Sequence, residues 1–164
     1  MVILGIDPGM ARCGFGIIEK KGNSIKYLSA GVIESESGLK QTERLEIIYK
    51  GIKKLIKKFK PDIIAIESLF FSKNVKTAFH VGEARGVILL AGQLKKIKII
   101  EFTPLQVKIS ITGYGFAEKM QIQKMVKIIL GLKEMPKPDD AADALAIAIC
   151  CANSLKMKMF KNKN

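Results

Sequence analysis

The chain has 164 residues, and its 28 Lys and Arg against 15 Asp and Glu give a net charge of +13. This length fits a single domain, and so basic a chain is typical of proteins that bind polyanions, with nucleic acid the first partner to consider. One His and three Cys without a Cys-x-x-Cys spacing are too few for a zinc site and argue against a disulfide framework. A bound metal should therefore be one that prefers oxygen ligands, such as Mg²⁺ or Mn²⁺.

The N-terminal sequence lacks the charged region and long apolar run of a signal peptide, and no stretch reaches the roughly 20 apolar residues of a membrane span. We therefore expect a cytoplasmic protein with reduced cysteines. Most of the positive charge is lysine, so a lysine-rich proteome would produce the same charge without any nucleic-acid partner.

The first part of the chain predicts three strands, a helix and a fourth strand. The opening apolar run stops at the turn signal Asp7-Pro8-Gly9, and Lys21-Gly22-Asn23 suits a hairpin turn. Apolar residues then recur at helical spacing until Pro61. The predicted strands are residues 2–6, 14–20, 25–34 and 63–66, and the predicted helix is residues 42–60.

The second part predicts a helix, a fifth strand and three more helices. Thr103-Pro104 is a typical helix start, and Gly113-Tyr114-Gly115 breaks that helix. The other helices are expected at residues 75–96, 117–130 and 138–156, and the strand at 97–102. This order predicts one α/β domain over residues 1–156, followed by a basic, flexible tail at 157–164. Its five-stranded mixed sheet should begin as an antiparallel meander and continue with parallel strands.

Two carboxylates directly follow predicted buried strands. Asp7 follows the first strand and Glu67 the fourth, so both should emerge at strand ends, where open α/β sheets place their sites. Each has an ordinary explanation: Asp7 suits a turn before Pro8, and Glu67 suits a solvated strand end. Either residue alone is therefore weak evidence for a site.

The last predicted helix carries three more carboxylates near its start. Asp143 shares a helical face with Asp139 or Asp140, and one of these two suits the helix cap or first turn. Asp143 lies beyond the first turn among Ala, Leu and Ile, where a carboxylate needs a cation unless it simply faces water. Acidic ligands without His or Cys suit Mg²⁺, and two such ions support in-line hydrolysis of a phosphodiester.

Six short segments stand out in chain order: Leu4–Gly9, Ala65–Glu67 with Phe70 and Lys73-Asn74, Gly82–Gly86, Gln106–Lys108, Ala117–Lys119 and Asp140–Ala146. Together they resemble the motifs of the RuvC family of Holliday-junction resolvases over nearly the whole chain. The resemblance implies a ribonuclease H-like fold with helices on both faces of the sheet. It also implies a homodimer that nicks two opposed strands of a four-way DNA junction in recombination and repair.

The resemblance also implies roles for individual residues. It makes four acids both catalytic and metal-binding, and so favours Asp140 over Asp139: these acids are Asp7, Glu67, Asp140 and Asp143. It implies Mg²⁺ as the cofactor, with two ions per site when DNA is bound, and Mn²⁺ as a substitute. It places Lys108 and Lys119 at the scissile phosphate or the developing charge.

Further DNA contacts are implied for four residues, namely Phe70, Lys73, Asn74 and Arg85. Phe70 would stack on bases near the crossover, although a buried loop anchor is the ordinary role of such a Phe. His80 is expected to be structural. A branch-migration complex of a junction-binding protein and a hexameric ATPase is the further partner that the resemblance suggests.

A four-way junction has approximate two-fold symmetry, and its resolution needs two symmetric cuts, so a dimer with one two-fold axis fits the chemistry. We expect the helix at residues 75–95 to contribute to the interface, because small side chains let helices approach closely. These small residues are Gly82, Ala84, Gly86, Ala91 and Gly92.

Three other functions compete with this one. The Gly5–Gly9 segment also resembles a phosphate motif of actin-like sugar kinases and chaperone ATPases, but those proteins need a duplicated domain that 164 residues cannot supply. Another ribonuclease H-like nuclease, acting on RNA hybrids or duplex ends, is a closer rival. A junction-binding architectural protein is the third, although a pure binder gains nothing from acids that face phosphate.

Overall fold

The computed structural model describes residues 1–68 and 75–161, with five strands and five helices in that part of the chain. The strands are β1 (Val2–Asp7), β2 (Arg12–Lys21), β3 (Ser24–Glu34), β4 (Ile63–Glu67) and β5 (Lys98–Phe102). The helices are α1 (Gln41–Phe59), α2 (Val75–Gln93), α3 (Pro104–Thr112), α4 (Lys119–Ile129) and α5 (Asp139–Lys161). The predicted element order is confirmed.

The strands form one mixed sheet in the order β3-β2-β1-β4-β5. β1, β2 and β3 make an antiparallel meander, while β4 lies parallel to both β1 and β5. β1 is therefore the central strand, and it joins the antiparallel part of the sheet to the parallel part. This is the mixed five-stranded topology predicted from the sequence.

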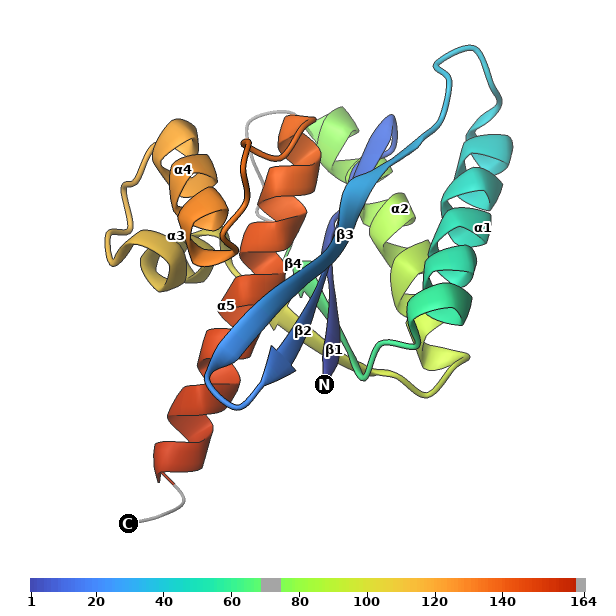
Figure 1. The fold of residues 1–164 in the computed structure, drawn as a ribbon. Coiled ribbons are helices and arrows are strands. Elements are labelled where there is room, and N and C mark those ends of the chain that lie inside the picture. Colours follow the sequence, from blue (N-terminus) through green and yellow to red (C-terminus); the bar gives the residue numbers. More distant parts are fainter. Residues whose placement is uncertain (69–74, 162–164) are drawn as a thin grey trace.

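Helices cover both faces of the sheet, as Figure 1 shows, with α1 and α2 on one side and α3, α4 and α5 on the other. Each face has its own apolar core. One core joins the sheet to α1 and α2 and includes Ile48, Ile52 and Ile88, and the other joins it to α3, α4 and α5. The alternation of side chains along β1 supplies both, because Ile3 points to one core and Leu4 to the other.

Helix α5 lies unusually close to the centre of the sheet. A Cβ atom added to Gly5 of β1 would collide with the backbone of α5 at Ala144, and one added to Gly14 of β2 would collide with Asp140. Strand residues without side chains therefore let the start of α5 rest on β1 and β2. This contact fixes how α5 is rotated, and hence which of its acidic residues faces the end of β1.

Three helix boundaries differ from the prediction. Helix α2 ends at Gln93, because the chain turns there and Lys96 takes a left-handed conformation with φ 54°. Helix α4 begins only at Lys119, where the Gln121 side chain accepts a hydrogen bond from the backbone N–H of Glu118. Helix α5 continues to Lys161, so the predicted helix end at residue 156 was too early.

Three of the five small residues of α2 are buried inside the protein. Ala84 and Ala91 are buried in the core beneath α2, and Gly92 packs on Ile64 and Ile99 of the sheet. Gly86 is the exposed one, and a Cβ added there would meet open space. The expectation that this whole set permits close approach of a second helix was therefore wrong for its buried members.

In the described part of the chain, no helix combines the length and the apolar character that crossing a membrane requires.

Candidate active site

Asp7 and Glu67 lie side by side at one edge of the sheet. Asp7 is the last residue of β1 and Glu67 the last residue of β4, and these neighbouring strands are parallel, with Ile6 opposite Ile66. Asp7 directly follows Ile6, and Glu67 directly follows Ile66. Parallel pairing therefore brings together two acids that are far apart in sequence, as their positions after apolar runs predicted.

Helix α5 adds its acidic first turns to the same edge. Asp140 and Asp143 lie three residues apart on this helix, and α5 packs on β1 and β2 through the strand glycines. The Asp143 side chain is 30% exposed and the Asp140 side chain 23% exposed, whereas that of Asp139 is 64% exposed. The rotation of α5 thus turns Asp140 and Asp143 inward and Asp139 toward solvent.

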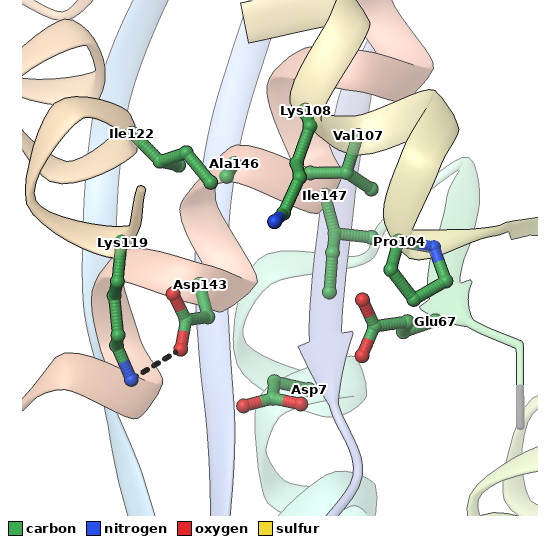
Figure 2. Close-up of a pocket in the computed structure, with 10 residues that line it drawn as sticks. All are labelled: Asp7, Glu67, Pro104, Val107, Lys108, Lys119, Ile122, Asp143, Ala146 and Ile147. Carbon is green, nitrogen blue, oxygen red and sulfur yellow. Dashed lines mark ion pairs between the residues drawn. The ribbon is translucent and has the colours of Figure 1, made fainter. Parts of the chain in front are cut away.

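A cavity of about 220 Å³ lies at this edge, and acidic side chains from three elements point into it (Figure 2). Its lining residues are Asp7, Glu67, Pro104, Val107, Lys108, Lys119, Ile122, Asp143, Ala146 and Ile147. Three of the four predicted acids are therefore brought together. Asp140 stands next to this group rather than in the lining.

Two lysines and one arginine surround the acids. Lys119, at the start of α4, places its Nζ 2.9 Å from Asp143 Oδ2 and 3.5 Å from Asp139 Oδ2. Lys108 reaches the cavity from α3. Arg12 Nε lies 3.3 Å from Asp140 Oδ2, although that buried oxygen accepts no hydrogen bond from the described residues. Asp140 and Asp143 are thus each partly neutralised by a neighbouring cation, Arg12 and Lys119 respectively.

Burial and mutual repulsion raise the pKa values of the lining carboxyls. Burial is the largest cause at Asp7, and neighbouring carboxylates add to it, so that the Asp7 pKa rises from 3.8 to about 7. These neighbours are, in order of effect, Glu67, Asp143 and Asp140. Burial followed by the Asp143 charge raises the pKa of Glu67. Negative charge at this edge is therefore costly, and a bound cation would offset the cost.

Asp143 and Lys119 each stabilise the charged form of the other: Lys119 lowers the pKa of Asp143, and Asp143 raises the pKa of Lys119. Burial raises the pKa of Asp143, although its hydrogen bond and ion pair with Lys119 oppose that change. Burial by itself would lower the pKa of Lys119, but the hydrogen bond to Asp143 and the charges of Asp143 and Asp139 raise it overall. Lys119 is therefore held firmly in its charged form beside the cavity.

The donor set fits an oxygen-seeking divalent cation. Carboxylates supply the charge, and the buried Asp140 Oδ2 atom lacks a hydrogen-bond donor among the described residues. Within residues 1–68 and 75–161, no three His, Cys, Asp or Glu side chains already surround a common point closely enough to hold an ion. Coordination by three of these acids would therefore require their side chains to move closer together.

The other predicted site residues do not line the cavity. Arg85 is mostly buried, and its Nη2 lies 2.5 Å from Glu101 Oε2 on β5. His80 contacts Gln41 and Glu83, between α1 and α2, which agrees with a structural role. Three residues lie outside the described part of the chain, namely Phe70, Lys73 and Asn74.

Arg12 is the site residue that sequence reasoning missed. It lies at the start of β2, two residues before Gly14, which pairs with Asp7 in the antiparallel register. The short turn after Asp7 predicts that β2 returns alongside β1, so a cation near residue 12 was a usable signal. What the sequence alone did not supply was the side of the sheet on which Asp140 would meet it.

The sequence matches a known protein family over most of its length. The family model described as crossover junction endodeoxyribonuclease RuvC matches residues 3–151. The RuvC of Caldicellulosiruptor saccharolyticus is 58% identical over 151 residues, which are 92% of this chain and 91% of that protein. The RuvC of Halothermothrix orenii is 55% identical over 157 residues, which are 96% of this chain and 95% of that protein.

Solved structures agree with this match. Thermus thermophilus RuvC in complex with a Holliday junction substrate superposes with a TM-score of 0.92 at 35% identity, covering 96% of each chain. The yeast mitochondrial Holliday junction resolvase shares the fold, with a TM-score of 0.67 at 14% identity over 98% of this chain and 83% of that one. The sheet and its flanking helices are the ribonuclease H-like fold that the resemblance implied. The chain therefore belongs to the RuvC family of crossover junction endodeoxyribonucleases, which are metal-dependent nucleases.

Proposed function

We propose that this protein resolves Holliday junctions by metal-dependent hydrolysis of two opposed phosphodiester bonds, and that its acid-lined cavity is the active site. The observation that carries the proposal is the meeting of Asp7, Glu67 and Asp143, from three separate elements, in one cavity flanked by Lys108 and Lys119. Membership of the RuvC family and the basic chain agree with a junction DNA substrate.

Four acids would hold the metal: Asp7, Glu67, Asp140 and Asp143. Mg²⁺, with two ions per site on DNA and Mn²⁺ as a substitute, would activate water and neutralise the charge of the reacting phosphate. The choice of Asp140 over Asp139 is supported by its inward position and its effect on the pKa of Asp7. Arg12 would hold Asp140 in position beside the cavity.

The lysines act on the substrate phosphate in this proposal. Lys119 carries its charge beside Asp143, at the mouth of the acidic group, where it would stabilise the charge that develops on the phosphate oxygens. Lys108 approaches the same cavity from α3 and would orient the scissile strand. Apolar walls made by Val107, Ile122 and Ile147 would lower the polarity around the lysines and strengthen both effects.

The remaining DNA contacts stay predictions. Phe70, Lys73 and Asn74 would contact bases and backbone near the crossover, next to Glu67 in the chain. A DNA contact by Arg85 would compete with its ion pair to Glu101, so Arg85 is the weakest of the proposed contacts. Binding of a branch-migration complex is likewise proposed only from the family resemblance.

We also propose a homodimer, because one cavity makes one cut and resolution needs two. Helix α2 offers an apolar surface for the interface: Phe79 is 66% exposed, Leu90 55% exposed, and Leu94, directly after the helix, 61% exposed. Helical spacing places these residues on one face, together with the exposed Gly86. The partner of this surface would be the same face of a second copy, as two-fold symmetry requires.

The substrate assignment is tested with a synthetic four-way junction, a matched duplex and an RNA–DNA hybrid, each incubated with the protein and Mg²⁺. We expect paired nicks on the junction alone, and we expect Asp7→Asn to bind the junction without cutting it. Equal cutting of the hybrid or the duplex would favour another ribonuclease H-like nuclease. If wild type and Asp7→Asn both bind the junction and neither cuts it, an architectural role would be favoured.

A further inference from the structure

A second hollow lies at the opposite end of the sheet from the acids. This groove, of about 440 Å³, lies between the carboxyl ends of α1 and α2, and we call it the α1–α2 groove. It is lined by Lys53, Ile56, Lys57, Lys60, Pro61, Lys95 and Ile97. Helices α1 and α2 both end on the side where the chain begins (Figure 1), whereas the acids lie at the carboxyl ends of β1 and β4.

The α1–α2 groove and the acid-lined cavity are too far apart to bind the same phosphate group. Lys60 and Pro61 precede β4, while Glu67 ends it, so the length of a five-residue strand separates the groove from the acids. At about 3.3 Å per residue this is roughly 15 Å. The α1–α2 groove therefore does not belong to the catalytic cavity.

The groove combines an apolar floor with a cationic rim. Ile56 and Pro61 are buried and Ile97 is partly buried, while the four lining lysines are exposed. No ion pair joins these lysines to an acid within the described residues. Asp62 is the acid adjacent in sequence, and its Oδ2 accepts the Val2 backbone N–H at 2.6 Å. The rim charge is therefore not neutralised by the protein itself.

Helix stability accounts for only part of this lysine cluster. Lys57, in the last turn of α1, is favourable for the helix dipole. Lys60, however, has a left-handed backbone with φ 46°, a conformation in which glycine costs least. Glycine would be less strained than lysine at this position, so helix stability does not account for Lys60.

The geometry points to the α1–α2 groove as a docking site for an acidic peptide segment of another protein, one that carries an apolar side chain among its carboxylates. The carboxylates would pair with Lys53, Lys57, Lys60 and Lys95, and the apolar side chain would cover the floor. A DNA backbone also supplies negative charge, but its sugar–phosphate surface has no apolar side chain to fill the floor. The combination of floor and rim therefore favours peptide over nucleic acid.

The test uses two double variants of equal charge, one within α1 and one at its carboxyl end. Lys57→Gln with Lys60→Gln removes two rim charges, while Lys54→Gln with Lys58→Gln removes two exposed charges of α1 that do not line the groove. The probe is a fluorescein-labelled peptide of acidic residues ending in Leu-Phe, and a second peptide has Ser-Ser in place of Leu-Phe. Binding is measured by fluorescence anisotropy.

We expect saturable binding of the Leu-Phe peptide, weakened about tenfold by the groove variant and less than about twofold by the control variant. The Ser-Ser peptide should bind about tenfold more weakly than the Leu-Phe peptide. Lys60→Gly should weaken peptide binding without lowering the melting temperature, because glycine relieves the left-handed backbone. That result separates a lost contact from a damaged fold.

Three outcomes would overturn the inference. Absence of saturable peptide binding would remove it, and equal weakening by the two double variants would show attraction by net charge alone. If the peptide fails to bind while the groove variant loses more affinity than its control for a duplex of about 20 base pairs, the groove contacts nucleic acid instead. Junction nicking should be unchanged in both double variants, because neither touches the acid-lined cavity.

Discussion

At the scale of single residues, the cost of buried charge dominates the acid-lined cavity. Asp7 combines burial with three neighbouring carboxylates, and its raised pKa measures how much the folded protein resists its negative charge. The neighbours that have a cation, Asp143 with Lys119 and Asp140 with Arg12, belong to α5, whereas Asp7 and Glu67 end strands and have no ion pair in the described chain. The strand acids thus gain most from a metal ion.

The raised pKa of Asp7 predicts a pH-dependent gain from Asp7→Asn without metal. The folded protein binds this proton more tightly than the unfolded chain, so stability falls as pH rises from about 4 to about 7 and stays lower above that range. A shift from 3.8 to about 7 corresponds to at most about 4 kcal/mol. The variant should therefore be more stable than wild type at pH 8, and the difference should shrink toward pH 4.

Urea denaturation in EDTA at several pH values measures this difference. Saturating Mg²⁺ should stabilise wild type more than the variant, because the ion neutralises the charge that Asn lacks. A difference in unfolding free energy that stays constant from pH 5 to pH 8 would contradict the assigned cause.

Lys119→Ala should slow junction cleavage by about 100-fold while weakening junction binding far less, because its charge acts on the reacting phosphate rather than on overall attraction. Single-turnover rates and binding in Ca²⁺ separate the two effects. Lys124→Ala is the matched control, since Lys124 lies on the same helix, is exposed and does not line the cavity. An unchanged cleavage rate in Lys119→Ala would refute the role.

At the scale of elements, the position of α5 on β1 and β2 builds the site. Gly5 and Gly14 leave room for the helix backbone, and any side chain at either position would push α5 away from the sheet. Because Asp143 sits on α5 and Asp7 on β1, that displacement would change the distance between two acids of one cavity. Packing and catalysis therefore depend on the same contact.

Gly5→Ala is expected to destabilise the protein by about 1–3 kcal/mol or more, because its methyl group meets the backbone of α5 at Ala144 and Ala148. Any folded fraction should cleave junctions more slowly. Gly38→Ala is the control, because a Cβ there meets nothing within 4 Å. Thermal unfolding and cleavage of the two variants provide the comparison, and equal stability would show that α5 can shift without cost.

The sequence predicted elements better than contacts between them. Periodicity and turn residues were sufficient for all five strands, and strand ends alone pointed to Asp7 and Glu67. Helix ends that depend on local backbone geometry, such as the left-handed Lys96, were missed. Arg12 was also missed, since its partner Asp140 is reached only through the packing of α5. Residue periodicity does not determine that packing.

Other site residues needed the family resemblance rather than physical reasoning. Nothing in composition distinguishes Lys108 or Lys119 from the many other lysines, and helical spacing left Asp139 and Asp140 equivalent. The structure adds the rotation of α5, which exposes Asp139 and turns Asp140 inward. A rotation of this kind depends on the strand glycines, and their effect appears only once helix and sheet are in contact.

At the scale of the whole molecule, one domain carries distinct surfaces at different places: the acid-lined cavity, the exposed apolar face of α2 and the α1–α2 groove. The cavity and the groove lie at opposite ends of the sheet. A partner in the groove would therefore leave the cavity open to DNA, and a second copy at α2 would supply the second cut.

Leu90→Lys should convert the proposed dimer into a monomer that nicks junctions without pairing the cuts, because a charge at the centre of the apolar face opposes burial. Phe116→Lys is the control, since Phe116 is 82% exposed and lies between α3 and α4. Sedimentation equilibrium at micromolar concentration and a plasmid junction assay give the two readouts. A wild-type monomer, both alone and on junction DNA, would disprove the dimer.

The order of elements along the chain also controls when a nuclease can exist during synthesis. Asp7 and Glu67 are made early, but Asp140 and Asp143 belong to the last helix, and that helix covers the central strands. A chain that stops before residue 139 has two of the acids and an uncovered apolar sheet face. Premature termination should therefore yield an inactive chain subject to degradation, so that unfinished copies leave junction DNA uncut.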